Sequence, residues 1–111
     1  MKGSDVFKTA VNTLGKIAKH TLEINNVRKD ELDWLVPHQA NERIILAIAK
    51  KINLPREKII ITVNKHGNTS AASIPLAFDE ANSKGSFKNN DMIMLEAFGA
   101  GFTWGSILLK Y

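Results

Sequence analysis

Residues 32–43 read LDWLVPHQANER, and the fold of the chain can be worked outward from this stretch. The apolar run Trp34–Val36 is typical of a short buried strand. Pro37 has no N–H group to offer a sheet ladder, so the strand should end there and leave His38 at its carboxyl end. Asn41 is a favourable helix N-cap. A helix should follow, because isoleucines recur at helical spacing at Ile44, Ile45, Ile48 and Ile52.

The same succession of elements follows further along the chain. The β-branched run Ile59–Val63 predicts a second strand, which leads into the polar stretch Asn64–Ser70 and then a helix from about Ala71. A helix that connects two strands favours a parallel pair, whose carboxyl ends meet at one edge of the sheet. His38 and Asn68 should therefore lie close together at this edge, where ligands bind in open α/β sheets.

The remaining pattern completes a small α/β domain. An amphipathic helix should run from near Ser4 to Leu22, and the third helix should span about Ala71 to Ser83. The apolar stretches Asp91–Phe98 and Thr103–Lys110 should pair as a hairpin. The order α-β-α-β-α-β-β predicts a layered α/β fold with a mixed sheet, in one domain over residues 1–111.

Composition limits the class of protein. The chain has 111 residues, with 44% hydrophobic and 23% charged residues, which suits one small globular domain. No apolar run approaches the roughly 20 residues of a membrane span, and no signal peptide is recognisable, so we expect a cytoplasmic protein. The chain has no cysteine, which excludes disulfides, thiolate metal sites and a cysteine nucleophile of its own. The net charge of +4 favours acidic partners but does not by itself indicate nucleic acid.

Two familiar kinds of site do not fit the pattern. The histidines have no further ligand at metal-binding spacing, so we expect no metal. The glycines around Gly99 precede a predicted strand, whereas a dinucleotide-binding loop must lead from a strand into a helix. His66 is best interpreted as a residue that shapes its loop beside Gly67.

His38 and Asn68 allow two interpretations. A buried histidine that serves only the fold is one. The other is that a neutral imidazole N–H and a carboxamide N–H₂ point at one spot, where they would stabilise an oxyanion or enolate. Backbone N–H groups of the turn at residues 99–101 could supply a third donor.

Three motifs bear on this choice: VPHQAN (36–41), HGNTSAAS (66–73) and LEAFGAGFTWG (95–105). In this order and spacing they resemble the C-terminal third of the β-ketoacyl-acyl-carrier-protein synthase III family, which are thiolase-fold condensing enzymes of fatty-acid synthesis. The resemblance covers essentially all of the chain. It implies a Cys-His-Asn triad, in which His38 and Asn68 match the two donors that stabilise the enolate formed when malonyl-acyl-carrier protein loses carbon dioxide. That carbanion attacks an acyl group on the cysteine, and no cofactor beyond the acyl-coenzyme A and malonyl substrates is implied.

The resemblance extends to further positions. Asn41 matches a residue that lines the pantetheine tunnel, and Arg43 matches one that meets coenzyme A phosphates or the acidic carrier protein. Lys50 and Lys51 match the basic patch behind it, with a solvated helix face as the alternative interpretation of these charges. Phe98 matches a phenylalanine that packs beside the triad. Ala100, where many family members have glycine, matches the residue whose backbone N–H completes the oxyanion hole, which an alanine allows only at negative φ.

The family's cysteine and a central strand of the half-sheet would precede Met1, so we interpret the chain as a portion of a longer enzyme. Without its cysteine it cannot form an acyl-enzyme alone, which leaves a non-catalytic carrier-protein or coenzyme A binding remnant, or an inert fragment, as the alternative. Two strand pairs are expected: Trp34–Val36 with Ile59–Val63, and Asp91–Phe98 with Thr103–Lys110. The missing strand would leave an unpaired edge on each pair, facing the gap between them. We therefore expect a second polypeptide in the gap, an exchanged homodimer, or direct closure of one pair on the other.

Overall fold

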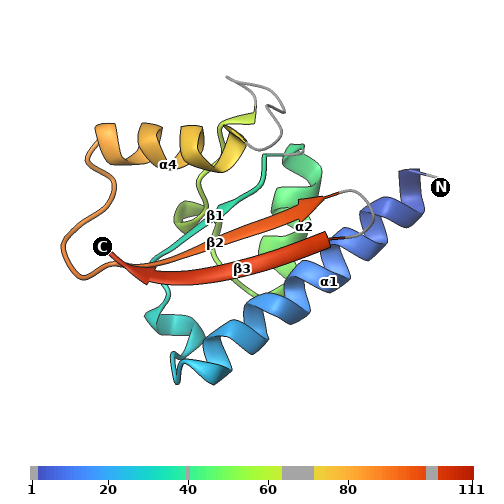
Figure 1. Cartoon of the computed structure of the whole chain (residues 1–111), viewed down its shortest axis with the longest axis horizontal. Coiled ribbons are helices and arrows are strands. Elements are labelled where there is room, and N and C mark those ends of the chain that lie inside the picture. Colours follow the sequence, from blue (N-terminus) through green and yellow to red (C-terminus); the bar gives the residue numbers. More distant parts are fainter. Residues whose placement is uncertain (1–2, 40, 64–71, 100–102) are drawn as a thin grey trace.

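The computed structural model describes residues 3–39, 41–63, 72–99 and 103–111 of the chain (Figure 1). Three α-helices, two short 3-10 helices and three strands follow one another in it. In chain order they are α1 (Gly3–Ile24), η1 (Lys29–Glu31), β1 (Trp34–Pro37), α2 (Glu42–Lys51), η2 (Arg56–Lys58), α4 (Ser73–Ser83), β2 (Met92–Gly99) and β3 (Thr103–Lys110).

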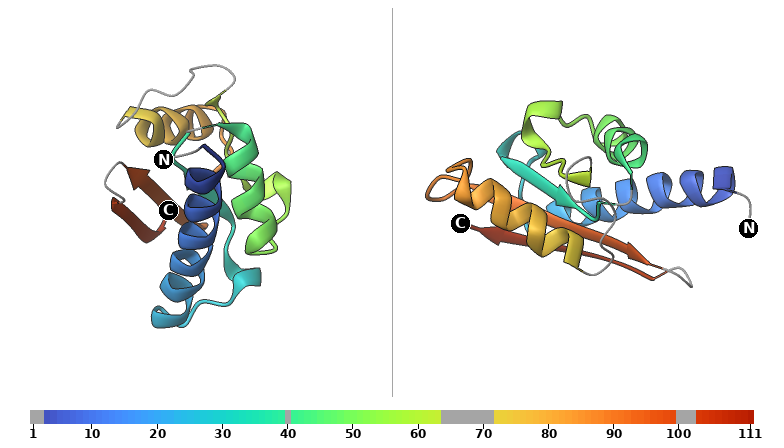
Figure 2. Two further views of the ribbon diagram at one scale, coloured as in Figure 1. Left: turned by 90° about the vertical axis from the view of Figure 1, so that its right-hand side faces the viewer. Right: turned by 90° about the horizontal axis from the view of Figure 1, so that it is seen from above.

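The sheet has the strand order β1-β2-β3. β1 runs parallel to β2, with Trp34 opposite Ile93 and Pro37 opposite Glu96, and β2 forms an antiparallel hairpin with β3. The views in Figure 2 place α1 and α2 on one side of the sheet and α4 on the other. The predicted α/β class with a mixed sheet and the predicted hairpin are therefore confirmed.

Alternating residues of the strands divide the core between these two sides, because successive strand side chains point to opposite faces. Leu35 and Met94 pack into the cluster formed with α1 and α2. Val36 and Ile93 pack into the second cluster, which includes residues of α4 and of the loop that follows it. The short strand β1 is thus covered on both faces, which suits its uninterrupted apolar sequence.

The first helix covers the sheet through one stripe, as predicted. Ala10, Leu14, Ala18 and Leu22 recur at every fourth position of α1, and all four are buried. Residues spaced by four lie on one helix face, so this stripe packs α1 against α2 and the sheet, with the partly buried Val11 beside it.

The second predicted strand, Ile59–Val63, forms only the beginning of a ladder. Ile59 makes an isolated parallel bridge to Leu35, and the N–H of Ile60 donates to the carbonyl oxygen of Leu35 at 3.0 Å. The next bond of a parallel ladder would run from the nitrogen of Pro37 to the carbonyl of Ile60, but proline has no N–H. The prediction of a regular strand is therefore wrong beyond its first residues, and Pro37 is the reason.

The side chain of Gln39 replaces the missing ladder bonds. Its Nε2 donates to the carbonyl oxygens of Ile60 at 3.1 Å and of Pro37 at 2.8 Å. Its Oε1 accepts the backbone N–H groups of Thr62 at 2.7 Å and of Val63 at 3.0 Å. Gln39 is 1% exposed. Its buried carboxamide therefore joins the end of β1 to the neighbouring extended segment by hydrogen bonds.

No gap separates the two strand pairs in the described part of the chain. β1 and β2 are hydrogen-bonded neighbours, which is the third of the three expected outcomes, direct closure. The expected bare inner edges are consequently absent there. The large exposed apolar side chains of the sheet lie instead on its edge strand β3, where Trp104 is 45% and Ile107 is 61% exposed.

One acidic side chain lies inside the sheet layer. Glu96 of β2 shares the face of Met94 toward α1 and α2, has no exposed surface, and neither of its carboxyl oxygens has a hydrogen-bond partner among the described residues. Ser106, its opposite residue in β3, also has a buried hydroxyl without such a partner. Burial raises the pKa of Glu96 to about 8, because the charged form loses its hydration.

The four hydrogen bonds of Gln39 predict that the chain loses much of its stability when the Gln39 carboxamide is removed. Gln39→Met keeps the volume but leaves the backbone groups of Ile60, Thr62 and Val63 buried without their partner, so the free energy of unfolding should fall by about 2–4 kcal/mol. Urea unfolding followed by circular dichroism measures this. Asn89→Ala, which removes an exposed amide, should change the value by less than about 0.5 kcal/mol. A Gln39→Met chain as stable as the Asn89→Ala chain would contradict the stabilising role of the Gln39 carboxamide.

Glu96 predicts a specific dependence of stability on pH. The folded chain favours the neutral carboxyl, so the stability that this group contributes is lost as the pH rises from its ordinary pKa of 4.5 through about 8. Between pH 7 and pH 9 the free energy of unfolding should fall by roughly 1.4 kcal/mol. Glu96→Gln should abolish this decline, and Glu57→Gln, at an exposed glutamate, should retain it. An equal decline in Glu96→Gln and the unmodified chain would assign the effect to another group.

Candidate functional site

His38 is held at the carboxyl end of β1 by the sheet itself. Its backbone N–H donates to the carbonyl oxygen of Glu96 at 2.7 Å, which extends the β1–β2 pairing past Pro37. The side chain is half-buried. Burial lowers the pKa of His38, which favours the neutral form that the donor interpretation requires.

The imidazole of His38 contacts the first residue of α4. Nδ1 lies 2.6 Å from Oγ of Ser73, and the backbone N–H of Gln39 donates to the same oxygen at 3.1 Å. Ser73 is 2% exposed, so this hydroxyl is shielded from water. The end of β1 and the start of α4 are thereby joined through one side-chain oxygen.

Gln39 and Ser73 are site residues that sequence reasoning missed. Gln39 ties the end of β1 to Thr62 and Val63, from which the chain continues toward Asn68. One signal was available for Gln39, because Pro37 interrupts the ladder and a long amide follows two residues later. Ser73 is the last residue of the motif at residues 66–73, but no local signal marked its role, which depends on where α4 begins relative to β1.

The structure describes three of the predicted site residues only in part or not at all. Asn68 and Ala100 are outside the described residues. Phe98 is placed by its backbone in β2, opposite Trp104 of β3. The proposed convergence of Asn68 with His38 therefore stays a prediction. It is consistent with the position of Val63, which Gln39 holds beside the end of β1.

The predicted substrate-binding residues are spread along α2. The side chain of Asn41 accepts the N–H of Ile44 at 2.9 Å, which confirms its role as the N-cap. Arg43 follows in the first turn, with its guanidinium carbon 5.3 Å from the ring centroid of Phe7 in α1. All of these polar side chains are exposed.

Lys50 and Lys51 lie in the last turn of α2. The seven-residue separation of Arg43 and Lys50 corresponds to about 10 Å along a helix axis, so the two cations could contact different parts of one extended acidic ligand. The stem of Lys51 lies against α1, since a Cβ atom built on Gly15 would be 2.7 Å from its Cγ. Within the described residues no ion pair includes any of these three cations.

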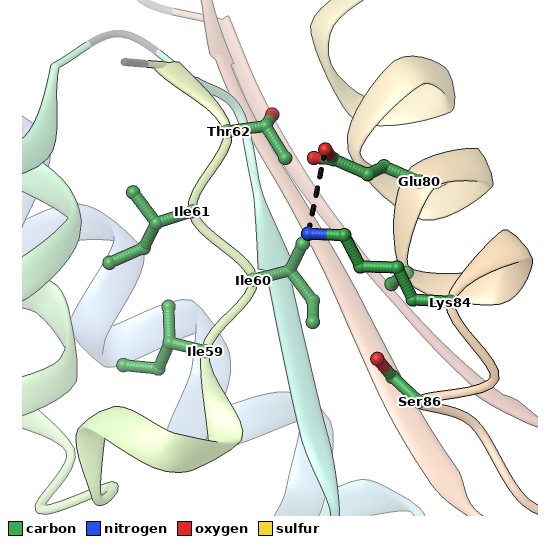
Figure 3. Close-up of a pocket in the computed structure, with 8 residues that line it drawn as sticks. Ile59, Ile60, Ile61, Thr62, Glu80, Lys84 and Ser86 are labelled. Atoms are coloured by element: carbon green, nitrogen blue, oxygen red, sulfur yellow. Dashed lines mark ion pairs between the residues drawn. The ribbon is translucent and has the colours of Figure 1, made fainter. Parts of the chain in front are cut away.

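A shallow pocket of about 190 Å³ lies between the extended segment at residues 59–62 and α4 (Figure 3). Glu80 and Lys84 form an ion pair at its rim, with Nζ 3.6 Å from Oε1. Its lining includes neither His38 nor Ser73, so this hollow is separate from the candidate site. Over the described ranges, no three or more histidine, cysteine or acidic residues gather as a metal site would require, and none of the helices is long and apolar enough to span a bilayer.

Comparisons with known proteins agree with the motifs. The family described as 3-oxoacyl-[acyl-carrier-protein (ACP)] synthase III C terminal matches residues 22–111. The β-ketoacyl-acyl-carrier-protein synthase III of Methylococcus capsulatus is 60% identical over 111 residues, which make up 100% of this chain and 35% of that protein. The enzyme of the same name from Blochmanniella floridana is 62% identical, with the same coverage of 100% and 35%. The chain thus spans about a third of the length of these curated relatives.

A solved structure bears on the strand order. The crystal structure of 3-oxoacyl-acyl-carrier-protein synthase III from Aquifex aeolicus VF5 is 47% identical and has a TM-score of 0.97, covering 100% of this chain and 36% of that chain. A strand inserted between β1 and β2 would move the two sides of the sheet apart by about 4.8 Å, which so high a TM-score does not allow. The expectation that another strand lies between these two is therefore wrong.

The position of His38, the three motifs and the family match over residues 22–111 lead to one conclusion. This chain belongs to the 3-oxoacyl-acyl-carrier-protein synthase III family and corresponds to the C-terminal part of its members.

Proposed function

We propose that the chain provides the decarboxylation half of a 3-oxoacyl-acyl-carrier-protein synthase III site, which begins fatty-acid synthesis by condensing an acyl-coenzyme A with malonyl-acyl-carrier protein. The observation that carries the proposal is the position of the His38 imidazole, which β2 and Ser73 hold at the carboxyl end of a buried strand, where burial lowers its pKa and favours the neutral form. A neutral donor can stabilise a developing negative charge without attracting a fixed anion beforehand.

The chemistry assigned to this half is the loss of carbon dioxide from the malonyl thioester. The bond between the carboxylate carbon and the methylene carbon breaks, carbon dioxide leaves, and the electron pair passes to the thioester oxygen as an enolate. His38 and Asn68 donate hydrogen bonds to that oxygen, and the backbone N–H of Ala100 serves the neighbouring oxyanion hole beside Phe98. The enolate carbon then attacks an acyl thioester, which requires a cysteine that this chain does not contain.

The exposed cations of α2 suit the acidic parts of both substrates. We assign Arg43 to the phosphates of coenzyme A or to the carrier protein, Lys50 and Lys51 to the acidic carrier protein, and Asn41 to the pantetheine arm. Support comes from the exposure of these side chains and from the lack of an ion pair between the three cations and other described residues. No cofactor is needed in addition to the substrates.

A second function from another class is favoured by the lack of cysteine. The chain could bind coenzyme A or carrier protein through α2 without turning over any substrate. The two functions differ in one outcome, which is whether a complementary chain that carries the cysteine restores condensation.

The catalytic proposal predicts the effect of removing either donor. The chain is mixed with the N-terminal portion of a family member that carries the cysteine, and product formation from acetyl-coenzyme A and malonyl-acyl-carrier protein is measured. His38→Ala and Asn68→Ala should each lower the decarboxylation rate by ~10²-fold or more, as the loss of an oxyanion donor does. His20→Ala, at an exposed histidine of α1, is the matched control and should leave the rate unchanged. Full rates in both donor variants would refute the proposed chemistry.

The binding assignment predicts a salt-dependent affinity for the acidic carrier protein. Arg43→Ala and Lys50→Ala should each weaken binding at low ionic strength by roughly threefold to tenfold, because exposed charges contribute modestly and are screened by salt. Lys88→Ala removes an exposed lysine outside α2 and should bind like the unmodified chain. Titration calorimetry at two salt concentrations measures the difference. An effect of Lys88→Ala equal to that of Arg43→Ala would indicate net charge alone.

A further inference from the structure

The two nitrogens of the His38 ring are not equivalent, because among the described residues only Nδ1 has a hydrogen-bond partner. Nδ1 lies 2.6 Å from Oγ of Ser73, at a hydrogen-bond distance. In a neutral imidazole one nitrogen carries the proton and donates, while the other accepts. The hydrogen bond at Nδ1 therefore decides which nitrogen is available as a donor on the other side of the ring.

The hydrogen-bonding capacity of Ser73 selects between the two forms. Its hydroxyl has one hydrogen to donate and two lone pairs. The backbone N–H of Gln39 already uses one lone pair, at 3.1 Å. If Nδ1 carried the ring proton, it would take the second lone pair, and the hydroxyl hydrogen would need another acceptor. Ser73 is 2% exposed, and among the described residues its hydroxyl has no partner other than His38 and Gln39.

The opposite arrangement satisfies every group. The Gln39 N–H donates to Oγ of Ser73, the Ser73 O–H donates to Nδ1 of His38, and the ring proton resides on Nε2. No buried donor is left without an acceptor, which would otherwise cost about 1–3 kcal/mol. The same chain of donors opposes protonation of Nδ1, because a protonated Nδ1 would face the hydroxyl hydrogen of Ser73.

We propose that Ser73 is a positioning residue that fixes His38 as the Nε2–H tautomer and so makes Nε2 the donor. The inference rests on the proposed function in one respect, that this donor is the one offered to the enolate. Ser73 is the first residue of α4, so the start of this helix and the end of β1 define the ring position together. A serine suits this place because it can accept from a backbone N–H and donate to a ring nitrogen at once.

The direct test is the tautomer of His38 in the folded chain. The chain is labelled with ¹⁵N at its histidine rings, and two-bond ¹H–¹⁵N correlation spectra are recorded at pH 7.5. The signals of His20, His38 and His66 are assigned from single His→Gln variants. The unmodified chain should show His38 with a protonated Nε2 and an unprotonated Nδ1. A protonated Nδ1 in the unmodified chain would overturn the proposal.

Variants of Ser73 separate positioning from general stability. Ser73→Ala removes the donor and should shift His38 to a mixture of tautomers or to Nδ1–H, whereas Ser73→Thr retains a hydroxyl and should keep Nε2–H. Ser106→Ala is the matched control, because it removes another buried hydroxyl that has no described partner, and it should leave the His38 signals unchanged. If Ser73→Ala fails to fold, Ser73→Cys, with its weaker donor, takes its place. A pure Nε2–H tautomer in the variant without the serine donor would refute the assignment.

Kinetics distinguish a failure of this inference from a failure of the proposed function. In the enzyme reconstituted with the cysteine-bearing portion, Ser73→Ala should lower kcat for decarboxylation by roughly tenfold to a hundredfold, with little change in KM, and Ser73→Thr should restore most of it. A tautomer shift without any change in rate would leave Ser73 as the residue that sets the tautomer but would remove His38 as the enolate donor. An unchanged tautomer with a reduced rate would refute positioning by Ser73.

Discussion

The buried carboxamide of Gln39 is the interaction on which the rest of the site depends. Pro37 removes one N–H group from the ladder at the point where β1 meets the extended segment that follows η2, and the Gln39 side chain supplies two donor bonds and two acceptor bonds in its place. The interruption affects only the edge of β1 that faces this segment, because His38, which follows directly, still pairs with β2 through its backbone N–H. An unrepaired break would have left polar backbone groups buried without partners.

Neutral groups dominate the interior near this point. Burial favours the uncharged form of both His38 and Glu96, the first by lowering its pKa and the second by raising it to about 8. The two residues are joined through the backbone, because the His38 N–H donates to the Glu96 carbonyl. An anionic carboxylate in the neighbouring strand would oppose the formation of the enolate proposed above. A protonated Glu96 removes that opposition, at the expense of two carboxyl oxygens that lack partners within the described ranges.

The positively charged side chains assigned to substrate binding lie instead on the surface of α2. Arg43, Lys50 and Lys51 are exposed along α2, whose N-terminal end follows the site and whose C-terminal end lies beside α1. This separation gives each part of the chain a different physical task. The strand end offers short-range, neutral hydrogen bonds in a shielded place, and the helix offers long-range attraction for acidic groups. Both tasks suit a thioester substrate carried on a phosphate-bearing arm, as proposed above.

The amino-acid sequence by itself determined the α/β class, the short strand that ends at Pro37, the N-cap at Asn41, the covering stripe of α1 and the family motifs, because each is a local pattern along the chain. Tertiary structure decided the rest. The direct β1–β2 pairing joins residues far apart in the sequence, and the contact of Ser73 with His38 exists only because α4 begins where β1 ends. Ile59–Val63 has the composition of a strand, yet its ladder stops because a proline on the neighbouring strand withholds one donor. Local propensity cannot reveal which partner a backbone group will meet. That partner decides whether Ile59–Val63 forms a ladder and which residue contacts His38.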